Sequence, residues 1–220
     1  MLPNLTHLLI AKQYQKLVAG CFFFVLLIVG FSIYKDYGVP IDEPVERNSG
    51  IISLNAIGER FQIPWVLNNT TLQNQAKKLG SLDQYRDRDY PVFYSIITVA
   101  LERAFKVKNE QDIYFFRHLL NYLACLIGIF AIYKLAQRRF SSWQLGLLAA
   151  TFFILSPRMF AESFYNSKDL IFLSAFAVAT YSLISFIEKP TIKIALWHAL
   201  ATSIAINVRN MAVIIVAMSI

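Results

Sequence analysis

The feature that most constrains this chain is a series of long apolar segments with almost no charge. The first covers residues 17–34, and others begin near residues 113, 143, 169 and 192. About 20 apolar residues are enough to cross a bilayer as an α-helix, which satisfies its own backbone hydrogen bonds. Since 56% of its residues are hydrophobic, we predict an all-α, polytopic transmembrane helix bundle and not a soluble domain.

The distribution of charge predicts how these helices are oriented. Lys12 and Lys16 precede the first apolar run, and enrichment of Lys and Arg in cytoplasmic segments places the N-terminus in the cytoplasm. The run is too long for a cleavable signal peptide, so we expect it to remain as a transmembrane helix. We therefore interpret the net charge of +7 as a sign of which segments face the cytoplasm. It does not predict a nucleic-acid partner, because no basic stretch with interleaved aromatic residues stands out.

We predict a single membrane domain over residues 1–220 that is incomplete at its C-terminal end. The first transmembrane helix covers 17–34, an extracytoplasmic loop covers 35–112, and further transmembrane helices lie within 113–220. We expect residues 156–168 to form an extracytoplasmic loop and the short helix before it to extend at both ends. The later helices are placed at Ile113–Tyr133, Trp143–Leu155, Asp169 or Leu170 to Ile187, Ile192–Ile206, and from Met211 onward.

The loop over residues 35–112 contains 11 of the 14 Asp and Glu residues. Apolar residues recur at helical spacing from Ile51 to Phe61 with polar residues opposite, which predicts an amphipathic helix at the membrane interface that ends near Gln62. The apolar stretch Pro91–Phe105 is too short to span a bilayer. We expect it to lie in the interface or to re-enter, because this leaves later clusters of basic residues on the cytoplasmic side.

Cysteine and histidine residues predict no metal site. Cys21 and Cys125 both lie inside apolar runs, so we expect buried, unpaired thiols and no disulfide. The three histidines are far apart in the sequence and form no ligand motif.

The stretch Gly38–Arg47 follows the first transmembrane helix almost directly. Asp42 and Glu43 lie between Pro40 and Pro44, and each proline restricts the backbone, so we predict a stiff acidic turn. Carboxylates so close to lipid are costly unless they are paired or hydrated, which makes them candidates for catalysis. The alternative is a solvated loop that carries two acids beside an anchor.

Two further polar segments, Arg86–Asp89 and Ser156–Asp169, face the same side in this topology. Basic residues among carboxylates at one membrane face can hold a phosphate beside a general base. A lipid-linked phosphosugar has the matching shape, with an apolar tail in the bilayer and an anionic head at its surface. The candidates for its phosphate are Arg158, Lys168, Arg117 and Arg88.

Each basic candidate also has a structural interpretation. Arg158 and Lys168 could extend to the interface from helix ends, and Arg86–Asp89 could pair internally. Arg117 could pair with Asp112 or Glu110 on the same helix. These alternatives stay open at the level of the sequence.

The order of these motifs resembles the GT-C superfamily. An Asp-Glu-Pro turn, a juxtamembrane helix and a Pro-led apolar segment come first, followed by Ser-Pro-Arg-Met-Phe at 156–160 and Phe-Tyr-Asn-Ser-Lys-Asp at 164–169. The chain looks most like an N-terminal part of the bacterial family-39-like glycosyltransferases, which are similar to protein mannosyltransferases and lipid A aminoarabinose transferases. The likeness covers most of residues 17–210.

The resemblance implies a multi-pass enzyme of a bacterial inner or plasma membrane. Such an enzyme transfers a sugar from a polyprenyl-phosphate donor to a lipid, glycan or protein acceptor on the extracytoplasmic face. By position, Asp42 would be the general base, Glu43 the second acid of the pair, and Asp169 an acid lining the same cavity. A divalent cation, Mg²⁺ or Mn²⁺, could bridge Asp42 or Glu43 to phosphate oxygens, but the sequence shows no complete ligand set.

Two other functions compete with the transferase. A non-catalytic transport or assembly subunit is one, although largely apolar helix interiors with polar groups gathered at one face disfavour transport. An inactive, truncated remnant of the transferase is the other, because the chain ends at Ile220 within an apolar run shorter than a bilayer requires.

Overall fold

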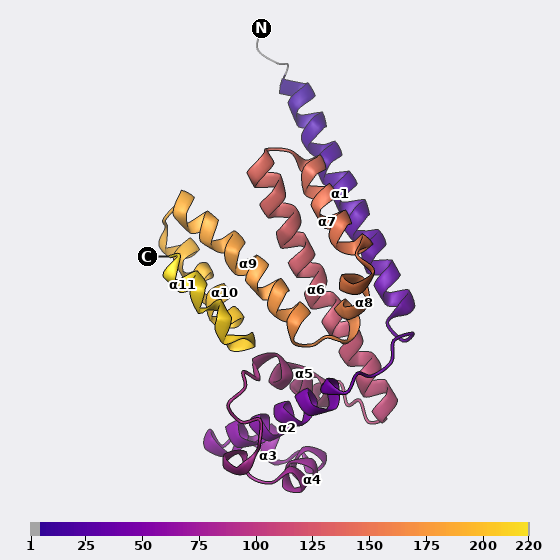
Figure 1. The fold of residues 1–220 in the computed structure, drawn as a ribbon, viewed down its shortest axis with the longest axis vertical. Helices are drawn as coiled ribbons and strands as arrows, with labels where there is room; N and C mark the ends of the chain where they lie inside the picture. The colour runs from indigo at the N-terminus through magenta and orange to yellow at the C-terminus, as the bar shows by residue number, and fades with distance from the viewer. Residues whose placement is uncertain (1–4, 220) are drawn as a thin grey trace.

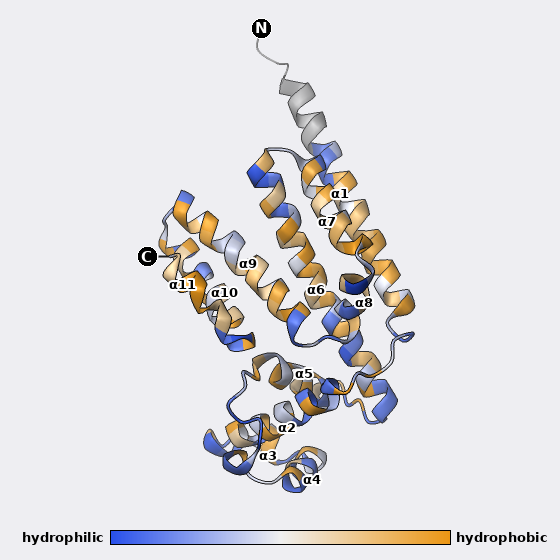
Figure 2. Ribbon diagram, in the orientation of Figure 1, coloured by the Kyte–Doolittle hydropathy of each residue, from blue (hydrophilic) through white to orange (hydrophobic). Residues whose placement is uncertain are grey.

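The computed structural model describes residues 5–219, with side chains from Gln13 onward, and this range contains helices and no strand. The prediction of an all-α bundle is confirmed. Long apolar helices run side by side, and a layer of shorter, more polar helices lies across one end of them (Figures 1 and 2). The side chain of Lys12, used above to orient the chain, lies outside the described residues.

Three helices of the described part are long and apolar enough to cross a membrane. They are α1 (Leu5–Ile33), of which Gln13–Ile33 qualifies, α6 (Glu110–Phe140) and α9 (Asp169–Glu188). A fourth span results if α7 (Trp143–Leu155) and α8 (Pro157–Tyr165) are taken together, with a bend of 74° between them. These lengths make the chain a multi-pass membrane protein.

The break between α7 and α8 differs from the expected long helix and following loop. That prediction is wrong at both points, since α7 keeps the bounds Trp143–Leu155 and residues 157–165 form a helix of their own. The cause is Pro157, because the residue before a proline avoids the helical conformation, and Ser156 is accordingly extended. Pro157 then occupies the first turn of α8, where its missing N–H has no consequence.

Helix α2 (Asp42–Arg60) begins inside the stretch predicted as a turn. Asp42 and Glu43 therefore form the first helical turn, and the turn prediction is wrong from Asp42 onward. Pro44 is compatible with this position because the first N–H groups of a helix have no partner within it. Two acids in the first turn also lie at the end of the helix where its dipole favours negative charge.

The remaining short helices pack around α2. They are α3 (Pro64–Leu67), α4 (Thr70–Leu79), the 3₁₀ turn η1 (Leu82–Gln84) and α5 (Phe93–Ala104). Their shared apolar core consists of Ile51, Leu54, Val66, Leu72, Ala76 and Val99. Helix α5 has only 12 residues and packs along α2, which agrees with its expected inability to span a bilayer.

At the C-terminal end, α10 (Ile192–Val208) packs along α9, followed by the 3₁₀ turn η2 (Asn210–Ala212) and α11 (Val213–Ala217). Alanines dominate this contact, with Ala179, Ala201, Ala205 and Ala212 almost inaccessible to solvent. Small side chains let the helix backbones approach closely, as is usual between helices in a membrane.

Both cysteines are free, but their burial differs from the prediction. Cys125 is buried on α6, whereas Cys21 is exposed on α1. Helix α1 packs through the face that carries Ala19 and Leu26. Cys21 is two residues from Ala19, which turns it about 200° around the helix and away from the bundle.

Gly50→Ala is expected to lower the thermal unfolding temperature of the purified protein in detergent. A Cβ at Gly50 would lie 2.5 Å from the Ser95 carbonyl oxygen of α5, and overpacking of this kind costs about 1–3 kcal/mol. Gly20→Ala is the matched control, since it is also within a helix but has no atom within 4 Å of the new Cβ. Equal unfolding temperatures for the two variants would contradict the close α2–α5 contact.

Candidate functional site

A cavity of about 200 Å³ lies between the first turn of α2 and the segment that joins α8 to α9. Of the predicted site residues, the structure brings Asp42, Glu43, Lys168 and Asp169 together here. The full lining consists of Pro40, Asp42, Glu43, Glu46, Glu162, Tyr165, Asn166, Ser167, Lys168 and Asp169. Two polar segments far apart in the sequence thus face one another across a single space.

The adjacent acids Asp42 and Glu43 have different surroundings. Successive residues of a helix point about 100° apart, so one side chain of the pair turns outward and the other inward. Asp42 is exposed, while Glu43 is only 1% exposed. One oxygen of Glu43 lies 3.1 Å from His118 Nε2 and the other 3.5 Å from Arg117 Nε. Asp42 is therefore available to a ligand, whereas Glu43 is held by the protein.

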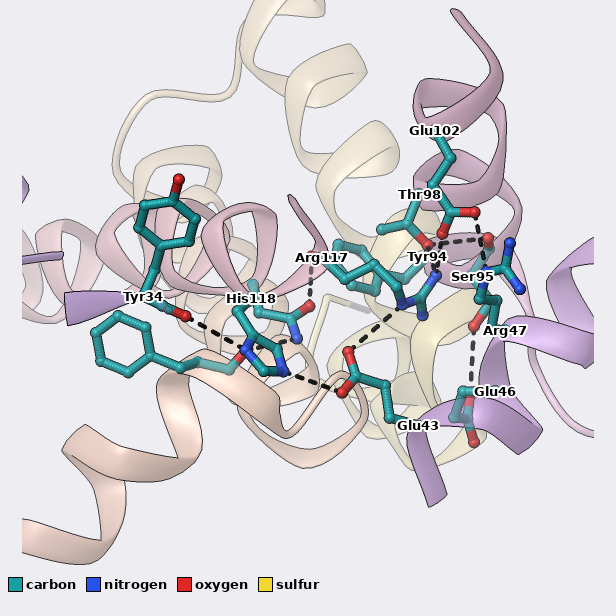
Figure 3. A network of polar contacts seen from close by, with 12 residues as sticks. Tyr34, Glu43, Glu46, Arg47, Tyr94, Ser95, Thr98, Glu102, Arg117 and His118 are labelled. Atoms are coloured by element: carbon teal, nitrogen blue, oxygen red, sulfur yellow. Dashed lines mark hydrogen bonds and ion pairs between the residues drawn. The ribbon is translucent and has the colours of Figure 1, made fainter. Parts of the chain in front are cut away.

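Glu43 belongs to a buried network of charged groups (Figure 3). Arg117 Nη1 donates to Glu102 Oε1 at 3.0 Å and to the Thr98 hydroxyl at 2.9 Å. The other oxygen of Glu102 accepts from Arg47 Nε at 3.0 Å. The alternating charges of Glu43, Arg117, Glu102 and Arg47 therefore connect α2, α5 and α6.

The partners of Arg117 correct one expectation. Asp112 or Glu110, close in sequence on the same helix, were considered as its partners, but its carboxylate contacts come from α2 and α5. Arg117 has no exposed surface, so it does not line the cavity. His118, on the next position of α6, also lies 3.3 Å from the backbone carbonyl of Tyr34, at the end of α1.

Lys168 and Glu46 form an ion pair at the mouth of the cavity. Lys168 Nζ lies 2.9 Å from Glu46 Oε1 and 4.8 Å from the centre of the Tyr90 ring. The second oxygen of Glu46 accepts from the Ser95 hydroxyl at 3.3 Å. Lys168, Glu46 and Asp42 also line a neighbouring hollow of about 190 Å³, which places them on the rim between two spaces.

Asp169 occupies the first position of α9, and its side chain is 56% exposed and paired with Arg209. Asn166 fixes this turn, since its side-chain oxygen accepts from the backbone N–H of Asp169 at 2.7 Å and of Lys168 at 3.2 Å. An Asn side chain that accepts from backbone N–H groups two and three residues further on forms an Asx turn. Asn166 thus fixes the backbone at Lys168 and Asp169, and the ion pair of Lys168 with Glu46 joins this turn to α2.

The other basic candidates do not line the cavity. Arg158 is 83% exposed and pairs with Glu162 one turn along α8 at 2.8 Å. Arg88 is exposed, pairs with Asp89 at 3.7 Å and donates to the Asp83 carbonyl. Lys168 is consequently the only one of the four predicted phosphate contacts that reaches this space.

Several lining residues were not among the predicted site residues. They include Glu46, Glu162 and Asn166, and each lies three or four residues from a predicted residue. This spacing could have identified them. Arg209, which holds Asp169, follows α10 on the expected extracytoplasmic side, and its charge was the available signal.

A second polar chain joins α5, α6 and α8. Tyr94 donates its hydroxyl to the Asn121 side-chain oxygen at 2.8 Å, and the Asn121 amide donates to the Phe164 carbonyl at 2.8 Å. Burial raises the pKa of Tyr94, so the phenol stays protonated and continues to donate at high pH. This chain fixes α8, and with it the wall of the cavity that faces α2.

The carboxylates at the cavity do not form a metal site by themselves. Among the residues with described side chains, no three His, Cys, Asp or Glu residues are placed to hold a metal ion. Glu43 is directed at Arg117 and His118, and Asp169 at Arg209. A divalent cation bound to Asp42 would therefore need most of its oxygen ligands from substrate and water.

Glu102→Gln is expected to destabilise the protein strongly, because it leaves Arg117 and Arg47 buried without the carboxylate between them. Breaking a buried ion pair from one side costs about 3–5 kcal/mol, which would appear as a large fall in the thermal unfolding temperature in detergent. Asp89→Asn is the control, since it removes a carboxylate whose side chain is 89% exposed and is expected to leave this temperature unchanged. Similar unfolding temperatures for both variants would show that the buried network contributes little to the stability of the folded protein.

The family model described as dolichyl-phosphate-mannose-protein mannosyltransferase matches residues 91–220. This range is more than half of the chain and includes α5 to α11, with Lys168, Asp169 and the α6 residues of the network. Asp42 and Glu43 precede it. No curated protein and no solved structure matches the chain.

Proposed function

The chain belongs to the dolichyl-phosphate-mannose-protein mannosyltransferase family of the GT-C superfamily, and we propose that it transfers a sugar from a polyprenyl-phosphate donor with Asp42 as general base. Membership confirms the resemblance drawn from the order of the motifs and makes the chain a membrane glycosyltransferase of the GT-C type. The donor, the acceptor and the role of each residue belong to the proposal.

The observation that carries the proposal is the position of Asp42. Its carboxylate is exposed at a cavity that also contains Lys168, while the neighbouring carboxylate of Glu43 is enclosed by Arg117 and His118. A general base must reach the proton that it removes, and Asp42 satisfies this condition whereas the oxygens of Glu43 are directed at Arg117 and His118. We therefore assign the base to Asp42 and a positioning role to Glu43.

In the proposed reaction, an acceptor hydroxyl enters the cavity beside Asp42. Its oxygen attacks the anomeric carbon of the sugar while its proton passes to the Asp42 carboxylate. The bond between the anomeric carbon and the phosphate oxygen breaks, and the polyprenyl phosphate leaves with the bonding electrons. Because attack and departure occur on opposite sides, the configuration at the sugar inverts.

Lys168 is proposed to neutralise the charge that develops on the leaving phosphate. Its ammonium group pairs with Glu46 at the rim shared by two hollows, and an ammonium is a suitable point contact for a phosphate. Arg117, Arg158 and Arg88 are not included in this role, because they lie off the cavity with protein partners. Asp169, held by Arg209, is proposed to orient the sugar or acceptor.

We further propose that the cavity faces the extracytoplasmic side of a bacterial inner or plasma membrane. The start of α1 and the end of α6 lie at the opposite end of the long helices from α2 (Figure 1). The first half of α1 carries Lys16, and the end of α6 carries basic residues from Lys134 to Arg139. The positive-inside rule assigns that end to the cytoplasm. The acceptor then approaches from outside, as a lipid, glycan or protein.

Asp42→Asn is expected to lower sugar transfer by about 10²- to 10⁴-fold, the usual contribution of a general base. The measurement uses membranes that contain the chain, a labelled polyprenyl-phosphate mannose and recovery of label in lipid and protein fractions. Asp36→Asn is the matched control, since Asp36 is also exposed in the loop after α1 but lines none of the described hollows. Transfer by Asp42→Asn close to the wild-type rate would contradict the assignment of Asp42 as general base. If membranes that contain the wild-type chain show no transfer, the inactive or non-catalytic alternatives are favoured.

Lys168→Gln is expected to raise the KM for the polyprenyl-phosphate donor more than the KM for the acceptor, since it removes a cation from the proposed phosphate contact. Steady-state kinetics with each substrate varied in turn measures this difference. Arg158→Gln provides the control, because Arg158 is a cation on the same segment but points to the surface. Equal effects of the two substitutions would indicate a general influence of charge at this face.

A further inference from the structure

A groove of about 500 Å³ lies between α1 and α6. Helix α2, which begins at Asp42, lies at the opposite end of the long helices from the start of α1 (Figure 1). The α1 wall of the groove carries Lys16, Gly20 and Phe23, and its α6 wall carries Phe130 and Lys134. These positions recur every three or four residues, so each set forms one face of its helix. The helices run in opposite directions, which brings the start of α1 beside the later part of α6.

The polar end of the groove is positively charged. No Asp or Glu lines it, and within the described residues neither Lys16 nor Lys134 pairs with a carboxylate. Lys134 donates to the Gln137 side chain at 3.2 Å and lies over the rings of Phe130 and Tyr133, at 5.6 and 5.3 Å. Two ammonium groups beside a space without counter-charge favour an anionic ligand.

The rest of the groove is apolar and open. Phe23 and Phe130 contact each other edge to face, with ring centres 5.3 Å apart. A Cβ built at Gly20 would meet no atom within 4 Å, so this glycine leaves free space along α1. An apolar trough below a pair of cations has the shape of a lipid with a charged head and an acyl chain.

The same end carries a marker of the membrane surface. Tyr14 of α1 packs edge to face against Trp143 of α7, with ring centres 6.0 Å apart. Tyrosine and tryptophan gather at the level of the lipid headgroups, where their rings meet both water and hydrocarbon. Lys16 lies only two residues from Tyr14, so the charged end of the groove is at headgroup depth.

We propose that this groove binds an anionic phospholipid of the leaflet opposite Asp42, with its phosphate between Lys16 and Lys134. One acyl chain would lie along Gly20, against the contacting rings of Phe23 and Phe130. Basic pockets between transmembrane helices on the cytoplasmic side are a recognised arrangement for anionic headgroups. The lipid would join α1 to α6, and the inference does not depend on the proposed transferase reaction.

The test is the thermal unfolding temperature of the purified chain in detergent as lipid is added. We expect dioleoyl-phosphatidylglycerol to raise this temperature in a saturable manner, because a ligand that binds only the folded state stabilises it. Dioleoyl-phosphatidylcholine and sodium phosphate at equal concentration are expected to produce little change. Equal stabilisation by phosphatidylcholine would overturn the requirement for an anionic head, and equal stabilisation by sodium phosphate would overturn the role of the acyl chain.

Two variants locate the effect. Replacing both lysines, Lys16→Gln with Lys134→Gln, is expected to abolish most of the stabilisation by phosphatidylglycerol, whereas Lys189→Gln with Lys193→Gln removes two exposed lysines that do not line the groove and should retain it. Gly20→Leu fills the apolar trough and keeps both lysines, and its Cβ meets no other atom within 4 Å. If this variant is no longer stabilised by phosphatidylglycerol, the lipid binds in the groove. A wild-type response in both groove variants would overturn the proposal.

Discussion

The ion pairs among Glu43, Arg117, Glu102 and Arg47 determine how the polar layer sits on the membrane helices. Each of these residues is buried, and a buried charge is tolerated only where its partner is in place. The three elements that supply them can therefore meet in few relative positions. Since Glu43 is in the first turn of α2, the network also fixes the direction in which Asp42 projects.

The opposite wall of the cavity depends on a different kind of constraint, which is local and comes from the backbone. Pro157 ends α7 and starts α8, and Asn166 holds the turn before α9, so the chain turns twice within a short segment. Lys168 then reaches Glu46 on α2. A rigid turn on one side and a buried ion network on the other leave the cavity between two independently supported walls.

The difference between these constraints explains what the sequence could predict. The membrane helices follow from apolar runs, which are a local property. The break at Pro157 is also local, but the length of the apolar run led us to expect that the helix over 143–155 extends further. The partners of Arg117 could not be derived, since the periodicity of α5 and α6 does not define their mutual rotation, and a nearby acid such as Asp112 was the natural choice. The first turn of α2 was missed because Pro44 is equally compatible with a loop and with a helix start. Three of the four basic candidates lie off the cavity for a related reason. Their position at one membrane face does not determine the direction in which each side chain projects.

Helix α1 connects the two sites considered above. Its first half lines the groove with Lys16 and Gly20. The residue that follows its last turn, Tyr34, presents its carbonyl to His118, which also contacts Glu43. Between these points Tyr122 of α6 donates to the Leu26 carbonyl at 2.7 Å and lies directly against Gly30. The position of α1 along α6 is thus set by these contacts and by the packing of Phe23 on Phe130, beside which the groove is open. A lipid in that groove would complete the contact between α1 and α6, and the chain that leads to Asp42 would then be held along its whole length.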